Sequence, residues 1–196
     1  MTAAVPVARA VIDFWFLPPD YPGHGAYRQE WFRKDDAFDA AIRARFGAEV
    51  EAALSGVPGE GSDQALLARI LLLDQFTRNI YRNTPRAFAG DAEALTLAEI
   101  LVGAGRDKNL SPWQRWFAYL PFEHSESLLD QERSVALYAG LRREMRHEAF
   151  DSAYDYALRH REAIARFGRF PHRNAILGRE STTEEIEFLK LPGSSF

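Results

Sequence analysis

The residues best suited to chemistry in this sequence are histidines near carboxylates. His124 and Glu126 flank a single serine in the segment 121–126, and His160 lies farther along the chain. A carboxylate beside a histidine orients the imidazole and stabilises its charged form, so such a pair can act as a general acid or base. One hypothesis is therefore an enzyme whose catalytic residues are His124, Glu126 and His160.

Structural roles for the same residues are an open alternative. Ser125 is a residue type that begins helices, and Glu126 would then lie in the first turn, where the helix dipole favours an acidic side chain. His160 falls on the apolar face of a predicted helix, where a histidine is usually a hydrogen-bonded core residue. It would act as a base only with a carboxylate such as Asp74 or Glu126 beside it.

The sequence offers little support for a metal centre. The chain has no cysteine, which excludes disulfides, thiolate ligands and a cysteine nucleophile. No His-Glu-x-x-His motif occurs, and the His-x-Glu element of zinc deaminases needs cysteines that are missing here. A metal would need ligands from distant positions, such as His124, Glu126, Asp91 and His160. We predict neither a metal nor a cofactor.

A basic run near the end of the chain is the second chemical feature. Residues 159–179 contain six arginines and two histidines but one acid, Glu162. Arginines can bind carboxylates and phosphates through two parallel hydrogen bonds. The run is compatible with an anion site, a nucleic-acid contact or internal ion pairs, although a net charge of −4 argues against nucleic acid. Internal partners would be Asp74, Asp91, Glu123 and Glu126.

A polar pair also lies within an apolar stretch. Leucines and isoleucines between residues 66 and 80 cover nearly the whole circumference of a helix, which is typical of a buried helix. Asp74 and Arg78 have i, i+4 spacing with the acid first, the order favoured for an ion pair. A buried pair needs good hydrogen bonds, because desolvation is costly. The two residues either lock a helix junction or present charge to a ligand.

These features combine into a binding hypothesis. A helical surface or cavity would present arginine and histidine side chains to an anionic small molecule or to an acidic peptide end. The alternatives are an enzyme that acts on an anionic substrate and a scaffold that binds partner proteins. The sequence does not identify the ligand or the oligomeric state. The predicted ligand-binding residues are Asp74, Arg78, Arg82, Arg169, His172, Arg173, Asn174 and Arg179.

The elements that must position these residues are helices. No segment shows sustained strand alternation, so we predict an all-α protein of about eight or nine helices in a single domain, residues 1–196. A glycine- and proline-rich segment at 55–61 is a candidate hinge. The predicted helices are 7–16, a segment that starts near residue 27, a longer helix capped by Asp35 or Asp36 that includes Phe38, Ile42 and Phe46, and then 62–80, about 91–102, 112–121, about 125–145, 148–167 and a last short helix through Leu189.

Local signals place several helix ends. Pro112 follows a capping serine and begins one helix, and Pro121 kinks or ends it. Gly168 ends the helix 148–167. Residues 181–184 read Ser-Thr-Thr-Glu, a capping box for the last helix.

The absence of cysteine fits a reducing compartment. No apolar run approaches the roughly 18 residues that a membrane span needs, and no leader segment is recognisable. We therefore expect a cytoplasmic protein without a membrane partner.

Several long motifs resemble the bacterial family catalogued as domain of unknown function 924. They follow in order through the chain at residues 11–16, 72–79, 119–126, 166–174, 177–179 and 181–182. The resemblance implies an all-α superhelix of the tetratricopeptide-like type. It implies no activity, so no catalytic residue is carried over from the family. Thr77 stands where the family commonly has proline, which affects local helix geometry.

Overall fold

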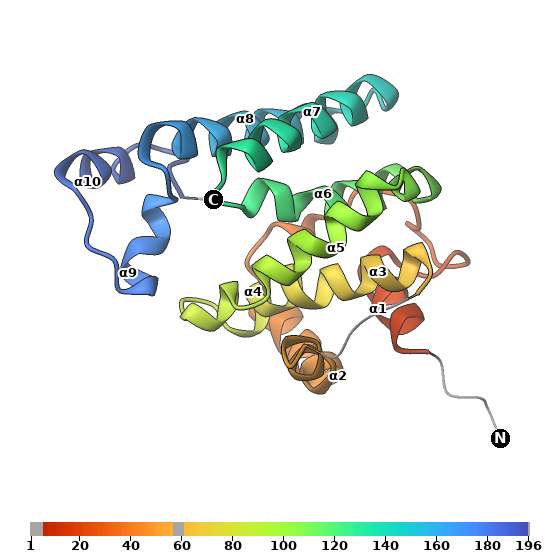
Figure 1. The fold of residues 1–196 in the computed structure, drawn as a ribbon. Helices are drawn as coiled ribbons and strands as arrows, with labels where there is room; N and C mark the ends of the chain where they lie inside the picture. The colour runs from red at the N-terminus through yellow and green to blue at the C-terminus, as the bar shows by residue number, and fades with distance from the viewer. Residues whose placement is uncertain (1–5, 57–60, 196) are drawn as a thin grey trace. The chain divides into compact units, whose positions relative to one another are not determined.

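The computed structural model describes residues 6–56 and 61–195, and its regular secondary structure in these ranges is entirely helical (Figure 1). The all-α fold class is therefore confirmed. None of the helices in these ranges combines the length and apolar character that crossing a membrane requires. The helices longer than one turn are α1 (Val7–Phe16), α2 (Asp36–Leu54), α3 (Asp63–Ile70), α5 (Asp91–Gly103), α6 (Pro112–His124), α7 (Leu128–Glu144), α8 (Glu148–Phe167) and α10 (Thr183–Leu189).

The chain divides into two compact units. Unit 1 comprises Met1–Arg82 and Arg86–Pro121, and unit 2 comprises Asn83–Pro85 and Phe122–Phe196. The single-domain assignment stays a prediction. Residues 57–60, the centre of the candidate hinge, lie outside the described residues. Pro121 does not end α6, which continues to His124.

Aromatic side chains form much of the core of unit 1. Trp15 of α1 is fully buried, and its ring centroid lies 5.4 Å from those of Phe76 and Phe117. Trp31, from the short 3-10 helix η1 (Gln29–Trp31), lies 5.0 Å from Phe117. Such pairs contribute about 0.5–1.5 kcal/mol each beyond their burial. They join segments that are far apart in the sequence.

The apolar stretch at 66–80 is one helical run with a wide turn at its centre. α3 leads into a π-helical segment, η2 (Leu71–Phe76), and then into α4 (Thr77–Ile80). The Thr77 hydroxyl donates to the Leu73 carbonyl at 2.7 Å. Thr77 therefore satisfies, through its side chain, a carbonyl that a proline at this position could not. π-Helical turns often occur where a helix carries function or strain.

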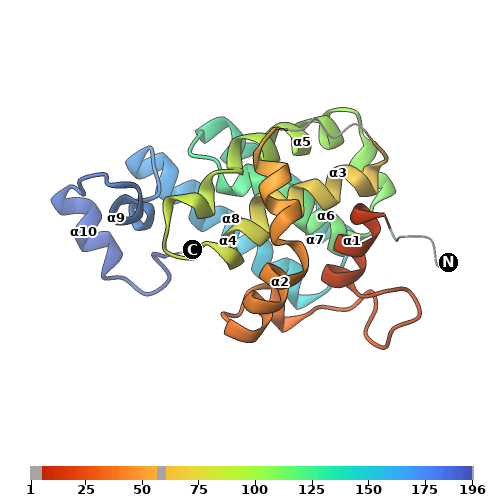
Figure 2. The ribbon, with the colours of Figure 1, turned by 90° about the horizontal axis from the view of Figure 1, so that it is seen from below.

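A glycine allows α5 to approach this wide turn. In unit 1, α1 and α5 lie against α3, and α2 lies against η2 and α4 (Figure 2). A Cβ atom on Gly90, the residue before α5, would lie 2.4 Å from the Leu73 carbonyl oxygen. Because the Leu73 atoms near this position belong to the backbone, they cannot move away without a large cost in free energy.

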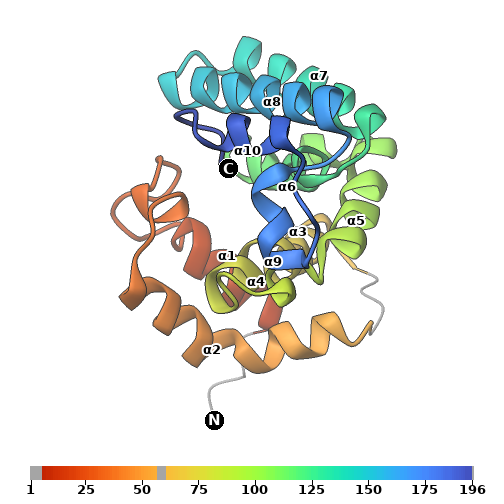
Figure 3. The ribbon, with the colours of Figure 1, turned by 90° about the vertical axis from the view of Figure 1, so that its left-hand side faces the viewer.

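Unit 2 begins with a helical hairpin. α7 and α8 are joined by three residues and lie side by side (Figure 3). Ser127, and not Ser125, caps α7 by accepting the Asp130 N–H, so Glu126 precedes the helix. The predicted cap at Ser125 was therefore wrong. Gly168 ends α8 in the left-handed conformation, as predicted.

The end of unit 2 contains two short helical turns and a last helix. The 3-10 helix η5 (Pro171–Arg173) leads into α9 (Asn174–Leu177). The capping box of α10 uses Thr182 and Glu185, one residue later than the sequence predicted. The remaining 3-10 helices of the described residues are η3 (Pro85–Phe88) and η4 (Arg106–Asn109).

Gly90→Ala should destabilise the protein by at least about 2 kcal/mol, because the new methyl group overlaps the Leu73 backbone. Urea denaturation measures this change. Gly103→Ala is the matched control: Gly103 is an exposed residue of α5 with no atom in the path of a Cβ. Alanine there should be neutral or stabilise by up to about 1 kcal/mol. Equal effects of the two substitutions would contradict the close approach at Gly90.

Candidate functional site

Glu126 connects the loop before α7 to the segment after α8. Arg179 donates to both carboxylate oxygens of Glu126, at 2.7 and 3.0 Å, and the Phe170 N–H donates to the same group at 2.8 Å. Burial raises the pKa of Glu126, but the hydrogen bonds from Arg179 and Phe170 outweigh burial and leave that pKa below its usual value. Glu126 is therefore a charged structural junction.

Arg179 also organises the chain around α9. Its Nη2 atom donates to the Phe170 carbonyl at 3.0 Å, and its Nε donates to the Asn174 side-chain oxygen at 3.0 Å. The buried Asn174 amide in turn donates to the Ser181 hydroxyl at 3.0 Å. The two predicted ligand-binding residues Asn174 and Arg179 thus hold the chain in place around α9.

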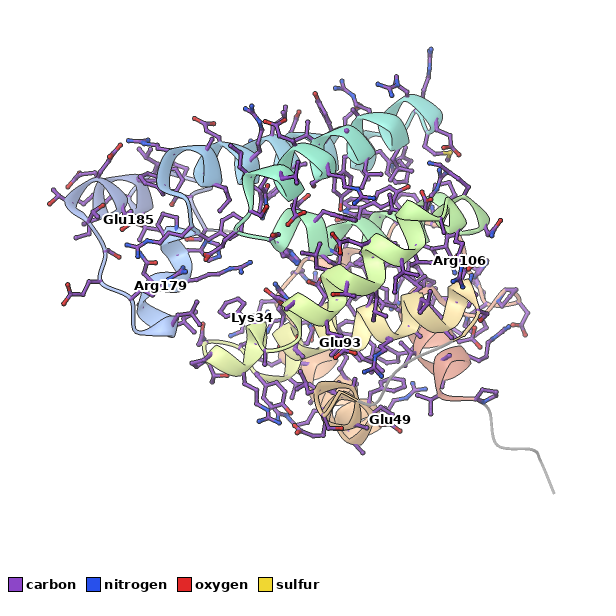
Figure 4. The ribbon with its side chains drawn as sticks, viewed as in Figure 1. Lys34, Glu49, Glu93, Arg106, Arg179 and Glu185 are labelled. Atoms are coloured by element: carbon purple, nitrogen blue, oxygen red, sulfur yellow. The ribbon has the colours of Figure 1, made fainter. Side chains whose placement is uncertain are left out.

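Arg169 is bound by a buried carboxylate. It donates to both oxygens of Glu185, at 2.6 and 2.8 Å, and Glu185 is 2% exposed. The hydrogen bonds from Arg169 lower the pKa of Glu185 to about 2, with help from the Thr182 N–H. Figure 4 shows Glu185 on α10 and Arg179 beside α9. Arg166 also binds Glu184 in this region. Three arginines of the basic run, Arg166, Arg169 and Arg179, therefore form ion pairs within unit 2.

The predicted residues of unit 1 form a separate network. Arg78 donates to both oxygens of Asp91, at 2.9 and 3.0 Å, and lies 3.3 Å from the fully buried Asp74. Arg82 forms a bidentate ion pair with Asp39, in which Nε and Nη2 each donate to one carboxylate oxygen. The sequence interpretation did not select Asp39. This arrangement is the locked helix junction that was one of the two alternatives for Asp74 and Arg78.

The other predicted residues gather in unit 2. We call them the histidine cluster: His160, His172 and Arg173 around the ring of Phe170, with His124 beside His160. The rings of His160 and His172 lie 5.4 and 5.7 Å from Phe170, and His124 lies 6.3 Å from His160. The guanidinium carbon of Arg173 lies 4.6 Å from the centre of the Phe170 ring. His124 and His172 are partly exposed, whereas the other three side chains are buried.

His160 is held in one protonation state. Its Nδ1 atom lies 2.9 Å from the Tyr156 carbonyl, which can only accept, and 3.4 Å from a Glu123 carboxylate oxygen. We therefore place the ring proton on Nδ1 and a lone pair on Nε2. Burial lowers the pKa of His160 well below 6.5, and the charges of His124, His172 and Arg173 lower it further. The ring is neutral at pH 7.

Glu123 is a site residue that the sequence interpretation did not include among the catalytic candidates. It is 5% exposed and takes the place beside His160 for which Asp74 and Glu126 were considered. The segment 121–126 had been selected, but no sequence pattern relates it to residue 160. Position alone separates Glu123 from Glu126: Glu123 lies in the last turn of α6, and Glu126 lies in the loop.

Gln131 supports the same part of the molecule. Its amide nitrogen donates to the carbonyls of Glu123 and Ser125 at 2.7 Å and to that of Phe122 at 3.3 Å. Carbonyls at the end of a helix have no partner within the helix, so this side chain satisfies them. Gln131 fixes the turn that carries His124. No pattern in the sequence indicates this role.

The geometry does not favour the metal alternative. Across residues 6–56 and 61–195, no three histidine, aspartate or glutamate side chains are arranged to hold a metal ion. Asp91, one of the ligands considered, is bound by Arg78 in unit 1.

Comparisons with known proteins place the chain in a family. A family model described as "Bacterial protein of unknown function (DUF924)" matches residues 11–193. Among solved structures, the protein of unknown function ATU0120 from Agrobacterium tumefaciens is similar, with a TM-score of 0.73 and 34% identity over 94% of this chain and 97% of that chain. The curated proteins contain no match. The matching descriptions assign no activity.

Glu185→Gln should change how stability depends on pH. The pKa of Glu185 falls on folding from 4.5 to about 2, so its stabilising effect is complete above pH 4.5 and is lost as the pH falls toward 2. The variant should lose about 1–2 kcal/mol at pH 7, less than the full pKa shift because Arg169 is partly exposed. Its unfolding free energy should depend less on pH between 4.5 and 2.

Urea denaturation at pH 2.5, 3.5, 5 and 7 measures this dependence. Glu187→Gln is the control on the same helix, because Glu187 makes an exposed pair with Lys190. It should keep the wild-type slope. A wild-type slope below pH 4.5 in Glu185→Gln would refute the buried pair.

His160 affects stability at higher pH. Because its pKa is lowered in the folded protein, the free energy of unfolding should decrease as the pH falls through 6.5.

Proposed function

We propose that this chain, which belongs to the bacterial family of unknown function DUF924, binds a small anion at the histidine cluster. The observation that carries the proposal is the gathering of these side chains in unit 2: His160, His172 and Arg173 lie around the Phe170 ring, and His124 lies beside His160. The ligand class is an organic phosphate or carboxylate, including the carboxylate end of an acidic peptide.

The charges near the cluster support an anionic ligand. Arg173 carries a permanent charge, and histidines beside a bound anion take up protons more readily. Glu126, which accepts the Phe170 N–H, is paired with Arg179. His124 and His172 are partly exposed, so they are the groups that a ligand can reach first.

In this proposal the predicted ligand-binding residues have two different roles. His172 and Arg173 contact the anion. Asn174 and Arg179 hold the chain segment that carries them, through the hydrogen bonds to Glu126 and Phe170. Arg169 supports the same region through α10, and Asp74, Arg78 and Arg82 stabilise unit 1.

Binding can be tested by thermal denaturation and isothermal titration calorimetry with phosphate, citrate and mononucleotides. A ligand at one hundred times its Kd should stabilise the fold by about 2.7 kcal/mol. The double variant His124→Gln/His172→Gln should weaken binding about tenfold, because two charge-assisted hydrogen bonds are lost. His24→Gln, which changes an exposed histidine of unit 1, is the control and should bind as the wild type does. Absence of a stability change with every anion would refute the proposal.

A second candidate function is acid–base catalysis on the bound anion. The contact of 3.4 Å between His160 and Glu123 favours it, because a buried carboxylate on the Nδ1 side stabilises an imidazolium formed when Nε2 takes up a proton. In this candidate His160 is the base and Glu123 is its positioning residue. His124 would hold the substrate, and Glu126 would act only through Phe170.

The two candidates differ in what His160→Gln should do. A catalytic His160 predicts a loss of about 10²- to 10⁴-fold in the rate of the chemical step, with a change of only a few fold in ligand affinity. Single-turnover kinetics with a ligand identified by calorimetry would measure it. If the wild type leaves such a ligand chemically unchanged, the binding function stands and the enzyme candidate fails.

A further inference from the structure

A groove at the turn between α7 and α8 is a second place in unit 2 where basic side chains gather. The groove has a volume of about 680 Å³, within the range of small-molecule sites. Arg142 and Arg143 come from the last turn of α7, Arg146 and His147 come from the loop, and Tyr154 comes from α8. His147 and His160 are 13 residues apart on α8, so the groove lies about 20 Å along the helix from the histidine cluster.

The charges in the groove do not cancel. Arg142 donates to Asp151, and its guanidinium carbon lies 5.2 Å from the centre of the Tyr154 ring. The Arg142–Asp151 ion pair therefore adds no net charge to the groove. Within the described part of the chain, Arg143 and Arg146 make no ion pair, and both are exposed. They differ in this from Arg161 and Arg166 of α8, which bind Glu132 and Glu184.

The acidic groups at the rim limit what can bind. Glu148 also lines the groove, and it opposes one of the two arginine charges. The His147 Nδ1 accepts the Ala149 N–H as the cap of α8. Arg143 and Arg146 against Glu148 leave the groove with a net positive charge. Its volume is several times that of an inorganic anion, which leaves room for an organic group against Tyr154.

We infer that the α7–α8 groove binds an organic molecule through one phosphate or carboxylate group, held by Arg143 and Arg146. The paired Arg142 and the Tyr154 ring form the surface on which the organic part of the ligand lies. Two guanidinium groups can contact a phosphate or carboxylate through paired hydrogen bonds. This site is independent of the histidine cluster.

The test is an NMR titration of the full chain labelled with ¹⁵N, with phenyl phosphate, benzoate and phenol as probes. Phenyl phosphate or benzoate should shift the amide signals of residues 139–154, and neutral phenol should not. The two anions distinguish a phosphate site from a carboxylate site. Arg143→Ala/Arg146→Ala should weaken binding at least about tenfold, since both charge-assisted contacts to the anion are lost.

Arg159→Ala is the matched control, because Arg159 is an exposed arginine of α8 outside the groove. It should bind both probes as the wild type does. Arg143→Lys/Arg146→Lys keeps the charges but removes the paired hydrogen bonds, so its affinity should fall between the wild type and the alanine variant. Shifts confined to residues 160–173, equal shifts with phenol, or unchanged binding by the alanine variant would overturn the inference.

Discussion

The candidate site depends on the ion pair between the Glu126 carboxylate and Arg179. The carboxylate accepts hydrogen bonds from the Phe170 N–H and from both Nη atoms of Arg179, and Arg179 also binds the Phe170 carbonyl. Both backbone groups of Phe170 are therefore fixed by one ion pair. Phe170 provides the ring under Arg173 and beside His160. The positions of the side chains in the histidine cluster therefore depend on the Glu126–Arg179 ion pair, which lies outside the cluster. Losing one member would leave a partly buried charge without its partner, which is strongly destabilising.

The helices could be predicted from the sequence because their signals are local. The apolar spacing and the prolines and glycines place α1, α5 and α8 within a residue or two. Cap positions were less certain where two capping residues stand close together. Ser125 and Ser127 both suit an N-cap, and the choice between them depends on differences of about 1 kcal/mol that are set by the surrounding fold. The π-helical turn of η2 has no such local signal.

The site was only partly predictable because its contacts join distant segments. A histidine is unusual on an apolar face, so the sequence could select His160, and Arg173 was selected as part of the basic run. Glu123 was expected only as a partner of the arginines, because no spacing rule relates it to His160, which lies 37 positions away. Glu126 was among the acids expected to pair with the basic run, and it does bind Arg179, but other ion pairs could not be predicted from spacing. Arg82 binds Asp39, across 43 residues, and no spacing rule distinguishes that acid from its neighbours.

In the proposed function, the buried polar groups around His160 have a role beyond structure. An isolated core position is best filled by an apolar side chain, since burying imidazole and carboxylate groups carries a desolvation cost that their contact only partly offsets. Here Glu123 and His160 are both buried, and further cationic groups lie close enough to lower the pKa of His160. A structural clamp such as Arg169 with Glu185 has matched charges and a complete set of hydrogen bonds. In the proposed function, Arg173 and the two partly exposed histidines are the groups that an anionic ligand would contact.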